Sequence, residues 1–393
     1  MNTALVAARP APALERPIRV MIVDDAVVAR SIVTRWVEAE LDMKVAASLR
    51  TGREALDNLE AADPDVVLLD VEMPELDGIA ALPLLLGKKR DLVIIMVSTL
   101  TRRSAELSLR ALALGATDYV PKPETTYEAM TSTAFRRELI DKVRGLGRKR
   151  LTLRKSTPVS APGEKLPPRG HVPPLPRAPE GAPRRTETGD VSLRPFALAT
   201  PRVLLIGSST GGPQALTVLV EKLPAAIDRA PMLITQHMPP TFTAVLAEHL
   251  SRASGRGVHE AEHGEPVLAG GVYLAPGARH MRVVRSGDCV KIALGDDPPI
   301  NFCKPAVDPL FSSAAEVWGS ASLGIGLTGM GNDGTRGAAD IVAAGGTVIA
   351  QDEATSVVWG MPRSVAQGGL CSAVLPLNQI APKILGLFSG DRS

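Results

Sequence analysis

The chain has 393 residues, more than one typical domain holds, so two domains are expected. Its 44 basic and 42 acidic residues nearly balance, which gives no global drive toward nucleic acid. Its three cysteines lack the spacing of a disulfide framework. Residues 1–17 lack the apolar core of a secretory signal, and no uncharged run approaches the ~20 residues of a membrane span. We expect a flexible tail over 1–17 and a cytoplasmic protein without a membrane span.

Residues 18–146 alternate between short β-branched runs and longer stretches with helical spacing. Because five βα units of this size form a parallel sheet, the segment is predicted to be flavodoxin-like, with any site at the carboxyl ends of the strands. The strand-like runs are Ile18–Val23, Met43–Ser48, Val66–Asp70, Leu92–Val97 and Thr117–Val120.

Polar side chains stand at the ends of four of these runs. Asp24 and Asp25 follow the first, Asp70 ends the third, Ser98 follows the fourth and Lys122 follows the fifth. Three carboxylates can share one pocket when a cation joins them, and oxygen ligands suit Mg²⁺. A carboxylate held this way can attack a phosphoryl donor. Taken singly, Asp24 and Asp25 also fit a helix N-cap, and Asp70 also fits a loop carboxylate.

Together these stretches resemble the receiver domain of two-component response regulators. The resemblance rests on "MIVDDAVVAR", "VVLLDVEMPELDGI", "IIMVSTL" and "TDYVPKP", and it covers residues 18–146. It implies that Asp70 accepts the phosphoryl group. It further implies a switch hydroxyl at Ser98, its charge partner at Lys122, and Mg²⁺ bound by Asp24, Asp25, Asp70 and the backbone carbonyl of Glu72.

A proline-rich segment separates this domain from the rest of the chain. Between Thr157 and Pro183 there are nine prolines and almost no β-branched or aromatic residues, which predicts a semi-extended linker. We assign the basic linker to 147–200. Its lysines and arginines fit either a solvated linker or an electrostatic docking surface.

The α/β alternation resumes over 201–387, with a short tail over 388–393. Strand-like runs occur at 202–207, 231–237, 270–275, 323–329 and 345–351, and they predict a doubly wound, mostly parallel sheet. Ser209 follows the first run, His237 ends the second and Asp333 lies in a glycine-dense turn after the fourth. A serine needs a base to take its proton, and the base needs an acid to hold its tautomer. Each of the three also has a plain explanation as a turn or loop residue.

The second domain is similar to the catalytic domain of the chemotaxis protein-glutamate methylesterase family. "GSSTGG", "QHMP", "APGARH" and "TGMGNDG" carry the resemblance, and with the receiver and linker it covers nearly the whole chain. It implies Ser209 as nucleophile, chosen over Ser208 by its register with the following Thr-Gly-Gly. It implies His237 as general base, Asp333 as the residue that orients it, and Thr210 and the Met330 backbone as oxyanion or positioning groups.

The resemblance implies an enzyme that hydrolyses glutamate γ-methyl esters on chemoreceptors and deamidates receptor glutamines. The implied phosphodonor is a chemotaxis histidine kinase, with Mg²⁺ in the receiver and no cofactor for the esterase. The rival hypothesis is a non-catalytic response regulator with a protein-binding output domain. A DNA-binding output is disfavoured because no basic recognition helix follows the linker.

Three further motifs were weighed against this hypothesis. "HEAEH" (His259–His263) fits a zinc-protease pattern, but Gly255, Gly257 and "GEP" around it leave no room for the helix that the pattern requires. The family resemblance instead implies a strand running into a turn. The glycines of "GSSTGGP" do not form a phosphate-binding loop, because the lysine of that motif does not follow them. The G-x-S-x-G turn of α/β-hydrolases is also absent.

Overall fold

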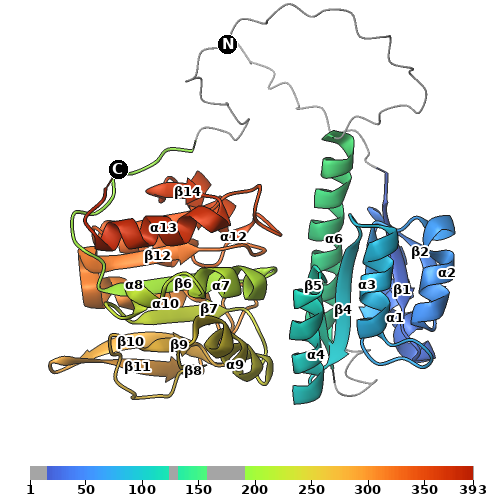
Figure 1. Ribbon diagram of the computed structural model, residues 1–393, viewed down its shortest axis with the longest axis horizontal. Helices are drawn as coiled ribbons and strands as arrows, with labels where there is room; N and C mark the ends of the chain where they lie inside the picture. The colour runs from blue at the N-terminus through green and yellow to red at the C-terminus, as the bar shows by residue number, and fades with distance from the viewer. Residues whose placement is uncertain (1–15, 124–131, 157–190, 393) are drawn as a thin grey trace, which may run out of the picture.

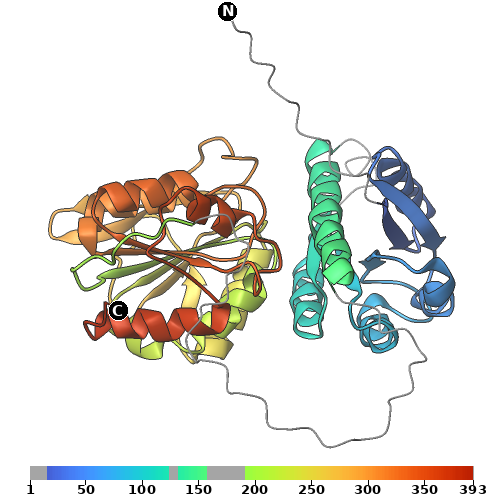
Figure 2. The same cartoon turned by 90° about the horizontal axis from the view of Figure 1, so that it is seen from above.

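The computed structural model describes residues 16–123, 132–156 and 191–392. In this part of the chain two α/β bodies stand side by side, the receiver-like one and the predicted esterase (Figures 1 and 2). The predicted tail over 1–17 falls almost wholly, and the proline-rich segment wholly, outside the described residues.

The first body is the predicted five-stranded parallel sheet, with strand order β2-β1-β3-β4-β5. Apolar residues alternate across its faces: Val20 and Ile22 pack with α1 and α6, while Met21 and Val23 pack with α2, α3 and α4. Its elements are β1 (Ile18–Val23), α1 (Val27–Glu38), β2 (Met43–Leu49), α2 (Gly52–Ala62), β3 (Val66–Asp70), α3 (Gly78–Lys88), β4 (Val93–Thr99), α4 (Arg102–Ala113), β5 (Asp118–Lys122) and α6 (Thr133–Ser156).

Helix α6 continues beyond residue 146, the predicted limit of this domain. The helix continues to Ser156 because residues beyond the limit still belong to the packed body. Leu151 is buried in the core with β1 and α1. Arg150 is buried and donates to the carboxylate of Asp91 and to the carbonyl of Pro64. Composition alone marked this basic stretch as linker, but its side chains have buried partners.

The second body is a seven-stranded sheet, parallel throughout, with order β14-β13-β12-β6-β7-β9-β8. Its elements are β6 (Val203–Ser208), α7 (Gly212–Val220), α8 (Pro224–Ile227), β7 (Met232–Gln236), α9 (Phe242–Ser254), β8 (Val258–Glu260), β9 (Val272–Leu274), β10 (His280–Ser286), β11 (Cys289–Gly295), α10 (Val307–Trp318), η1 (Gly319–Ala321), β12 (Ser322–Gly326), α11 (Thr335–Ala343), β13 (Thr347–Gln351), α12 (Met361–Gln367), β14 (Ala373–Leu375) and α13 (Leu377–Phe388).

The fold prediction is confirmed, with additions. The predicted runs correspond to β6, β7, β9, β12 and β13, and the antiparallel hairpin β10–β11 was not predicted. One face of the sheet packs against α7, α9 and α13, and the other against α10, α11 and α12. Structure also begins before residue 201: the Arg194 amide donates to the carbonyl of Cys371, and the Ala197 amide to the hydroxyl of Thr347. No helix in the described ranges is long and apolar enough to cross a membrane.

The two bodies are in contact (Figures 1 and 2). The first body contributes α4, β5 and α6 to this contact, and the second body contributes helix ends and loops. Tyr119 on β5 stacks on Phe242 of α9, with ring centroids 4.9 Å apart. Arg102 on α4 forms an ion pair of 2.6 Å with Glu248 on α9. Buried apolar side chains therefore form one cluster that continues from the receiver-like body into the second body.

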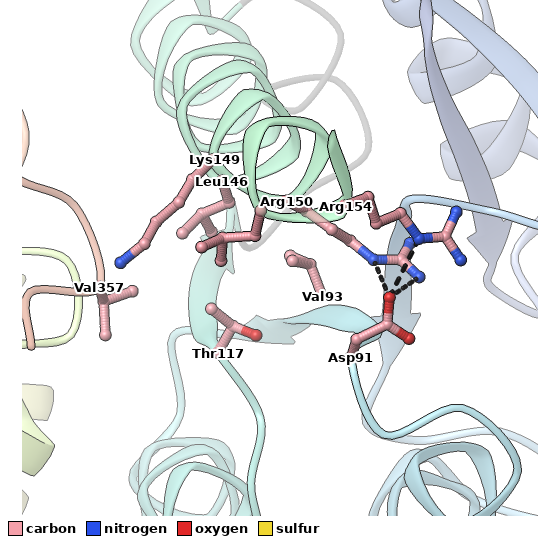
Figure 3. A pocket seen from close by; sticks show the side chains of 9 residues that line it. Asp91, Val93, Thr117, Leu146, Lys149, Arg150, Arg154 and Val357 are labelled. Atoms are coloured by element: carbon pink, nitrogen blue, oxygen red, sulfur yellow. Dashed lines mark hydrogen bonds and ion pairs between the residues drawn. The ribbon is translucent and has the colours of Figure 1, made fainter. Parts of the chain in front are cut away.

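A cavity of about 380 Å³ lies between α6 and the sheet of the first body and reaches the second body (Figure 3). Val93, Leu146 and Leu153 line it from the first body and Val357 from the second. Lys149 extends past it and donates to the carbonyl of Ser356. Helix α6 thus carries a direct polar contact to the second body.

Candidate functional site

Three loops follow the adjacent strands β12, β6 and β7, at the same edge of the sheet. Backbone hydrogen bonds continue between them beyond the strands: the His237 amide donates to the carbonyl of Ser208 (3.0 Å) and the Ser209 amide to that of Thr328 (3.0 Å). Because carboxyl ends of parallel strands meet at one edge, these contacts bring together the loops that carry Ser209, His237 and Asp333, as predicted.

The two serines of this site have different environments. Ser208 is the last residue of β6, is fully buried, and donates its hydroxyl to Oε1 of Gln236 at 2.7 Å. Ser209 is half-buried, and its hydroxyl forms no hydrogen bond with another described residue. The hydroxyl of Ser208 is occupied inside the fold, whereas that of Ser209 is free to react.

Glycines and Gln236 shape the turn after Ser209. Gly211 has a φ of 75°, the left-handed region that glycine adopts without strain. A Cβ on Gly212 would lie 1.9 Å from Oε1 of Gln236, so no side chain fits there. The Gln236 amide group also donates to the carbonyls of Ser209 (3.0 Å) and His237 (3.1 Å). Gln236 therefore fixes the serine loop against the histidine loop.

His237 and Asp333 form a direct side-chain pair. Nε2 of His237 lies 2.6 Å from Oδ2 of Asp333, and both side chains are nearly buried. The same carboxylate accepts the amides of Val307 (2.6 Å), Asp308 (3.1 Å) and Gly334 (2.9 Å). The carboxylate of Asp333 thus has four hydrogen-bond partners, and the three backbone amides among them orient it toward His237.

The pKa values of His237 and Asp333 both differ from their ordinary values. Burial by itself lowers the pKa of His237, but Cys303 and Asp333 outweigh burial and raise it to about 10. Burial would raise the pKa of Asp333, yet the hydrogen bond and charge of His237 and the donating amides bring it below its usual value. The pair therefore favours an imidazolium and a carboxylate in this arrangement.

Thr210 follows Ser209 in the chain, and Met330 follows Gly329, which lies against the serine. Neither backbone amide donates a hydrogen bond to another described residue, so each is available to an incoming oxygen. Thr210 is buried, and its carbonyl accepts the hydroxyl of Thr328 at 2.8 Å. Gly329 lies against the serine, since a Cβ there would be 2.8 Å from Cβ of Ser209.

Helix α6 of the first body lies over the loops of this site. Met330 reaches it, with Cε 3.4 Å from where a Cβ on Gly145 would stand. Lys149 contacts Ser356, whose neighbour Val357 packs against Gly211 beside the serine turn. The first body thus contacts two of the loops that surround Ser209.

The first body holds a second cluster of predicted residues at the carboxyl ends of β1, β3 and β5. Asp24, Asp25 and Asp70 each offer an oxygen within 4.8 Å of the others. Nζ of Lys122 lies 2.7 Å from Asp24 and 2.8 Å from Asp70. Burial raises the pKa of Asp70 to about 6, with Lys122 opposing it. This all-oxygen donor set fits a hard divalent cation.

The remaining receiver residues lie close to this cluster. Ser98 is buried on β4, and its hydroxyl bonds to the hydroxyl of Ser108 on α4 at 2.8 Å. Glu72 lies two residues beyond Asp70, and its exposed carboxylate is 3.9 Å from Arg103. The Ser98 hydroxyl therefore links the site to α4, one of the helices at the contact with the second body.

The two histidines of the zinc-like motif bind protein groups. His259 lies on strand β8 and pairs with Glu265 at 3.0 Å. Nδ1 of His263 accepts the backbone amide of Leu294. No metal-binding group was found there among the described residues, and the only such group contains Asp24, Asp25 and Asp70.

Sequence comparisons identify the family of each of the two domains. The CheB methylesterase family profile matches residues 204–384, and the response regulator receiver domain profile matches 20–133. A protein-glutamate methylesterase/protein-glutamine glutaminase of group 2 operon from Bradyrhizobium diazoefficiens is 62% identical over 380 residues, 96% of each chain. The chain belongs to the CheB methylesterase family. A Rhodopseudomonas palustris protein-glutamate methylesterase/protein-glutamine glutaminase is 60% identical over 379 residues, again 96% of each chain.

Solved CheB structures match the two bodies separately. The Thermotoga maritima CheB methylesterase catalytic domain is 43% identical and covers 48% of this chain and all of its own, with a TM-score of 0.46. The response regulator domain of Thermotoga maritima CheB is 36% identical and covers 35% of this chain and 98% of its own, with a TM-score of 0.30.

Sequence reasoning missed three residues of this CheB-family chain that the structure places at its site or domain contact. Gln236 connects the two catalytic loops, Cys303 acts on His237, and Phe242 receives Tyr119. Gln236 stands directly before His237 at the end of a buried strand, a position that signals a polar group with a structural role. Nothing in the local pattern of Cys303 or Phe242 indicates their partners.

Proposed function

We propose that Ser209, His237 and Asp333 carry out the protein-glutamate methylesterase and protein-glutamine glutaminase activity of this family in the present chain. The observation that supports this most is the bonded His237–Asp333 pair, held on strands adjacent to the one that presents Ser209. A serine hydroxyl is activated by a base that takes its proton and an acid that orients the base, and the histidine–aspartate pair supplies the second of these relations.

The hydrogen bonds assign a task to each nitrogen of His237. Nε2 is engaged by Asp333, so in the neutral imidazole, the form that acts as a base, Nδ1 is the nitrogen that takes the proton of Ser209. The serine oxygen then bonds to the γ-carbonyl carbon of the methylated glutamate. When that intermediate collapses, the bond to the methoxy group breaks and His237 returns its proton to the leaving methanol. Water, deprotonated by the same histidine, releases the glutamate carboxylate and restores the serine.

The amides of Thr210 and Met330 are suited to the oxygen that becomes negative in these steps. The same sequence of steps deamidates a glutamine, because only the leaving group changes, from methanol to ammonia. One site therefore accounts for both activities.

In the receiver domain we assign Asp70 as phospho-acceptor. Asp24, Asp25, Asp70 and the carbonyl of Glu72 would hold Mg²⁺, which when bound neutralises charge on the phosphoryl group. Lys122 already bridges Asp24 and Asp70 and supplies a fixed positive charge. Ser98 is the group that would turn from Ser108 toward the phosphoryl oxygens.

Regulation is supported by the contacts of the receiver with the esterase loops. Phosphorylation that moves Ser98 away from Ser108 acts on α4, and α4 together with α6 carries the contact with the second domain. We propose chemoreceptors as the substrates and a chemotaxis histidine kinase as the phosphodonor, both met in the cytoplasm. A purely protein-binding output domain is not favoured, because burying a paired histidine and aspartate has a cost that binding alone does not explain.

The nucleophile is tested with the two neighbouring serines. Ser209→Ala is expected to lower methanol release from a glutamate-methylated protein by about 10⁴-fold or more. Ser208→Ala is the matched control: it removes the bond to Gln236, costs about 1 kcal/mol of stability, and keeps kcat within about tenfold. A Ser209→Ala enzyme with near-normal kcat would show that the nucleophile lies elsewhere.

A further inference from the structure

A short turn beside the catalytic pair presents one aromatic side chain to the outside. Ile300 and Cys303 exchange two backbone hydrogen bonds, of 3.1 and 2.8 Å, and close the turn. Asn301 and Phe302 between them have φ values of 49° and 66°. The left-handed region is unfavourable for a phenylalanine, so this turn is held by its surroundings and not by local preference.

The turn is continuous with the catalytic machinery. Cys303, which closes the turn, contributes to raising the pKa of His237. A few residues further on, the amides of Val307 and Asp308 hold the carboxylate of Asp333. Phe302 is therefore one residue away from a group at the general base, on a segment anchored at the acid.

Phe302 is nevertheless 76% exposed, an unusual state for a phenylalanine with a rigid backbone. Its ring face is taken by one group only among the described residues, the guanidinium of Arg137 on receiver helix α6, 3.7 Å from the ring centroid. An exposed aromatic ring on a fixed turn next to a catalytic centre is typical of a recognition residue.

We propose that Phe302 is a docking residue for the protein substrate, and that Arg137 of the receiver covers the same ring face when the two domains are in contact. The ring would stack on a side chain close to the methylated glutamate, with the cationic or apolar chemistry that an aromatic face binds. The inference rests on the proposed esterase function and adds its specificity: one side chain serves the receiver and the substrate in turn.

The test compares two substrates on the full-length chain with a phosphodonor present. One substrate is a glutamate-methylated protein, and the other is a small γ-methyl ester of N- and C-blocked glutamate. For Phe302→Ala we expect the ratio of kcat/KM for the protein to kcat/KM for the small ester to fall about five- to tenfold, mainly through KM. Phe302→Tyr, which keeps the ring, should restore the ratio to within about twofold of the unchanged chain.

A second arm tests the masking. Without phosphodonor, Arg137→Ala should raise kcat/KM for the protein substrate about threefold or more, and it should have no such effect in a Phe302→Ala background. Arg136→Ala is the control on the same helix, because Arg136 pairs with Glu40 inside the receiver and should leave the rate as it was.

Two results would overturn the proposal: an equal loss on both substrates in Phe302→Ala, which assigns Phe302 to positioning of the catalytic loop, or an unaltered ratio. Failure of the esterase assignment itself would look different, because the unchanged chain would then release methanol from neither substrate.

Discussion

Replacing Asp333 by asparagine tests the catalytic pair most directly. The two carboxylate oxygens accept four N–H groups: Oδ2 those of His237 and Val307, and Oδ1 those of Asp308 and Gly334. An asparagine has one oxygen and one NH₂ group. Whichever way its amide is turned, the NH₂ group faces two donors, and two of the four bonds are lost.

The magnitude follows from that count. A hydrogen bond to a charged group contributes about 1.5–3 kcal/mol, so Asp333→Asn should lower the free energy of unfolding by about 3–6 kcal/mol. The histidine also loses the charge that orients it and stabilises its protonated form, and kcat should fall about 10³- to 10⁴-fold. Urea unfolding measures the first quantity, and methanol release from a methylated protein measures the second.

The pH dependence has a definite sign. The pKa of His237 in the fold, about 10, lies above its ordinary value of 6.5. The pair therefore contributes its full stability below about pH 6.5 and loses it as the pH rises toward 10. The difference in unfolding free energy between the unchanged chain and Asp333→Asn should accordingly shrink from pH 6 to pH 10.

Asp308→Asn supplies the control. Asp308 is a buried neighbour whose Oδ1 accepts the amide of Gly337, a bond that an asparagine oxygen can keep. It should change kcat little. The reasoning is refuted if folded Asp333→Asn keeps kcat within tenfold of the unchanged chain, or if the two variants lose activity alike.

Three further changes have measurable outcomes. Cys303→Ala should lower the pKa of His237, so the acid limb of the kcat/KM profile moves to lower pH and activity near pH 7 rises. Cys303→Ser, which keeps a hydrogen-bonding group, should fall between the two, and an unmoved limb contradicts the role of Cys303. Asp70→Asn should abolish activation by a small phosphodonor while basal methanol release persists; retained activation would place the phosphorylation elsewhere. Phe242→Ala removes the aromatic partner of Tyr119 and weakens the domain contact by the energy of one aromatic pair, so basal activity should rise about two- to fivefold. No rise would mean that this stack does not restrain the receiver.

The placement of the proposed catalytic residues was predictable because it depends on regular structure. Alternating buried runs indicate parallel strands, and the carboxyl ends of parallel strands meet at one edge. That rule alone put Ser209, His237 and Asp333 together, and likewise Asp24, Asp70 and Lys122. The family motifs then selected one role for each, which spacing had left open.

Other features could not be predicted, because they depend on where loops and helices pass in space. The bond of the buried Ser208 hydroxyl to Gln236 is visible only in the fold, although the motif had already selected Ser209 as the nucleophile. The extension of α6 to Ser156 depends on Asp91 and Pro64, which receive Arg150 from far along the chain. A basic run reads as solvated linker until such partners are in place.

By itself, then, the sequence determined the central strands of both sheets and the chemistry at their ends, since burial on two faces of a sheet imposes a period that residues display directly. Only the tertiary structure decided that Cys303 acts on His237, that Tyr119 stacks on Phe242, and that Arg137 covers Phe302. Each of these joins segments distant in the sequence through a single side chain, and a single contact leaves no periodic trace in either segment.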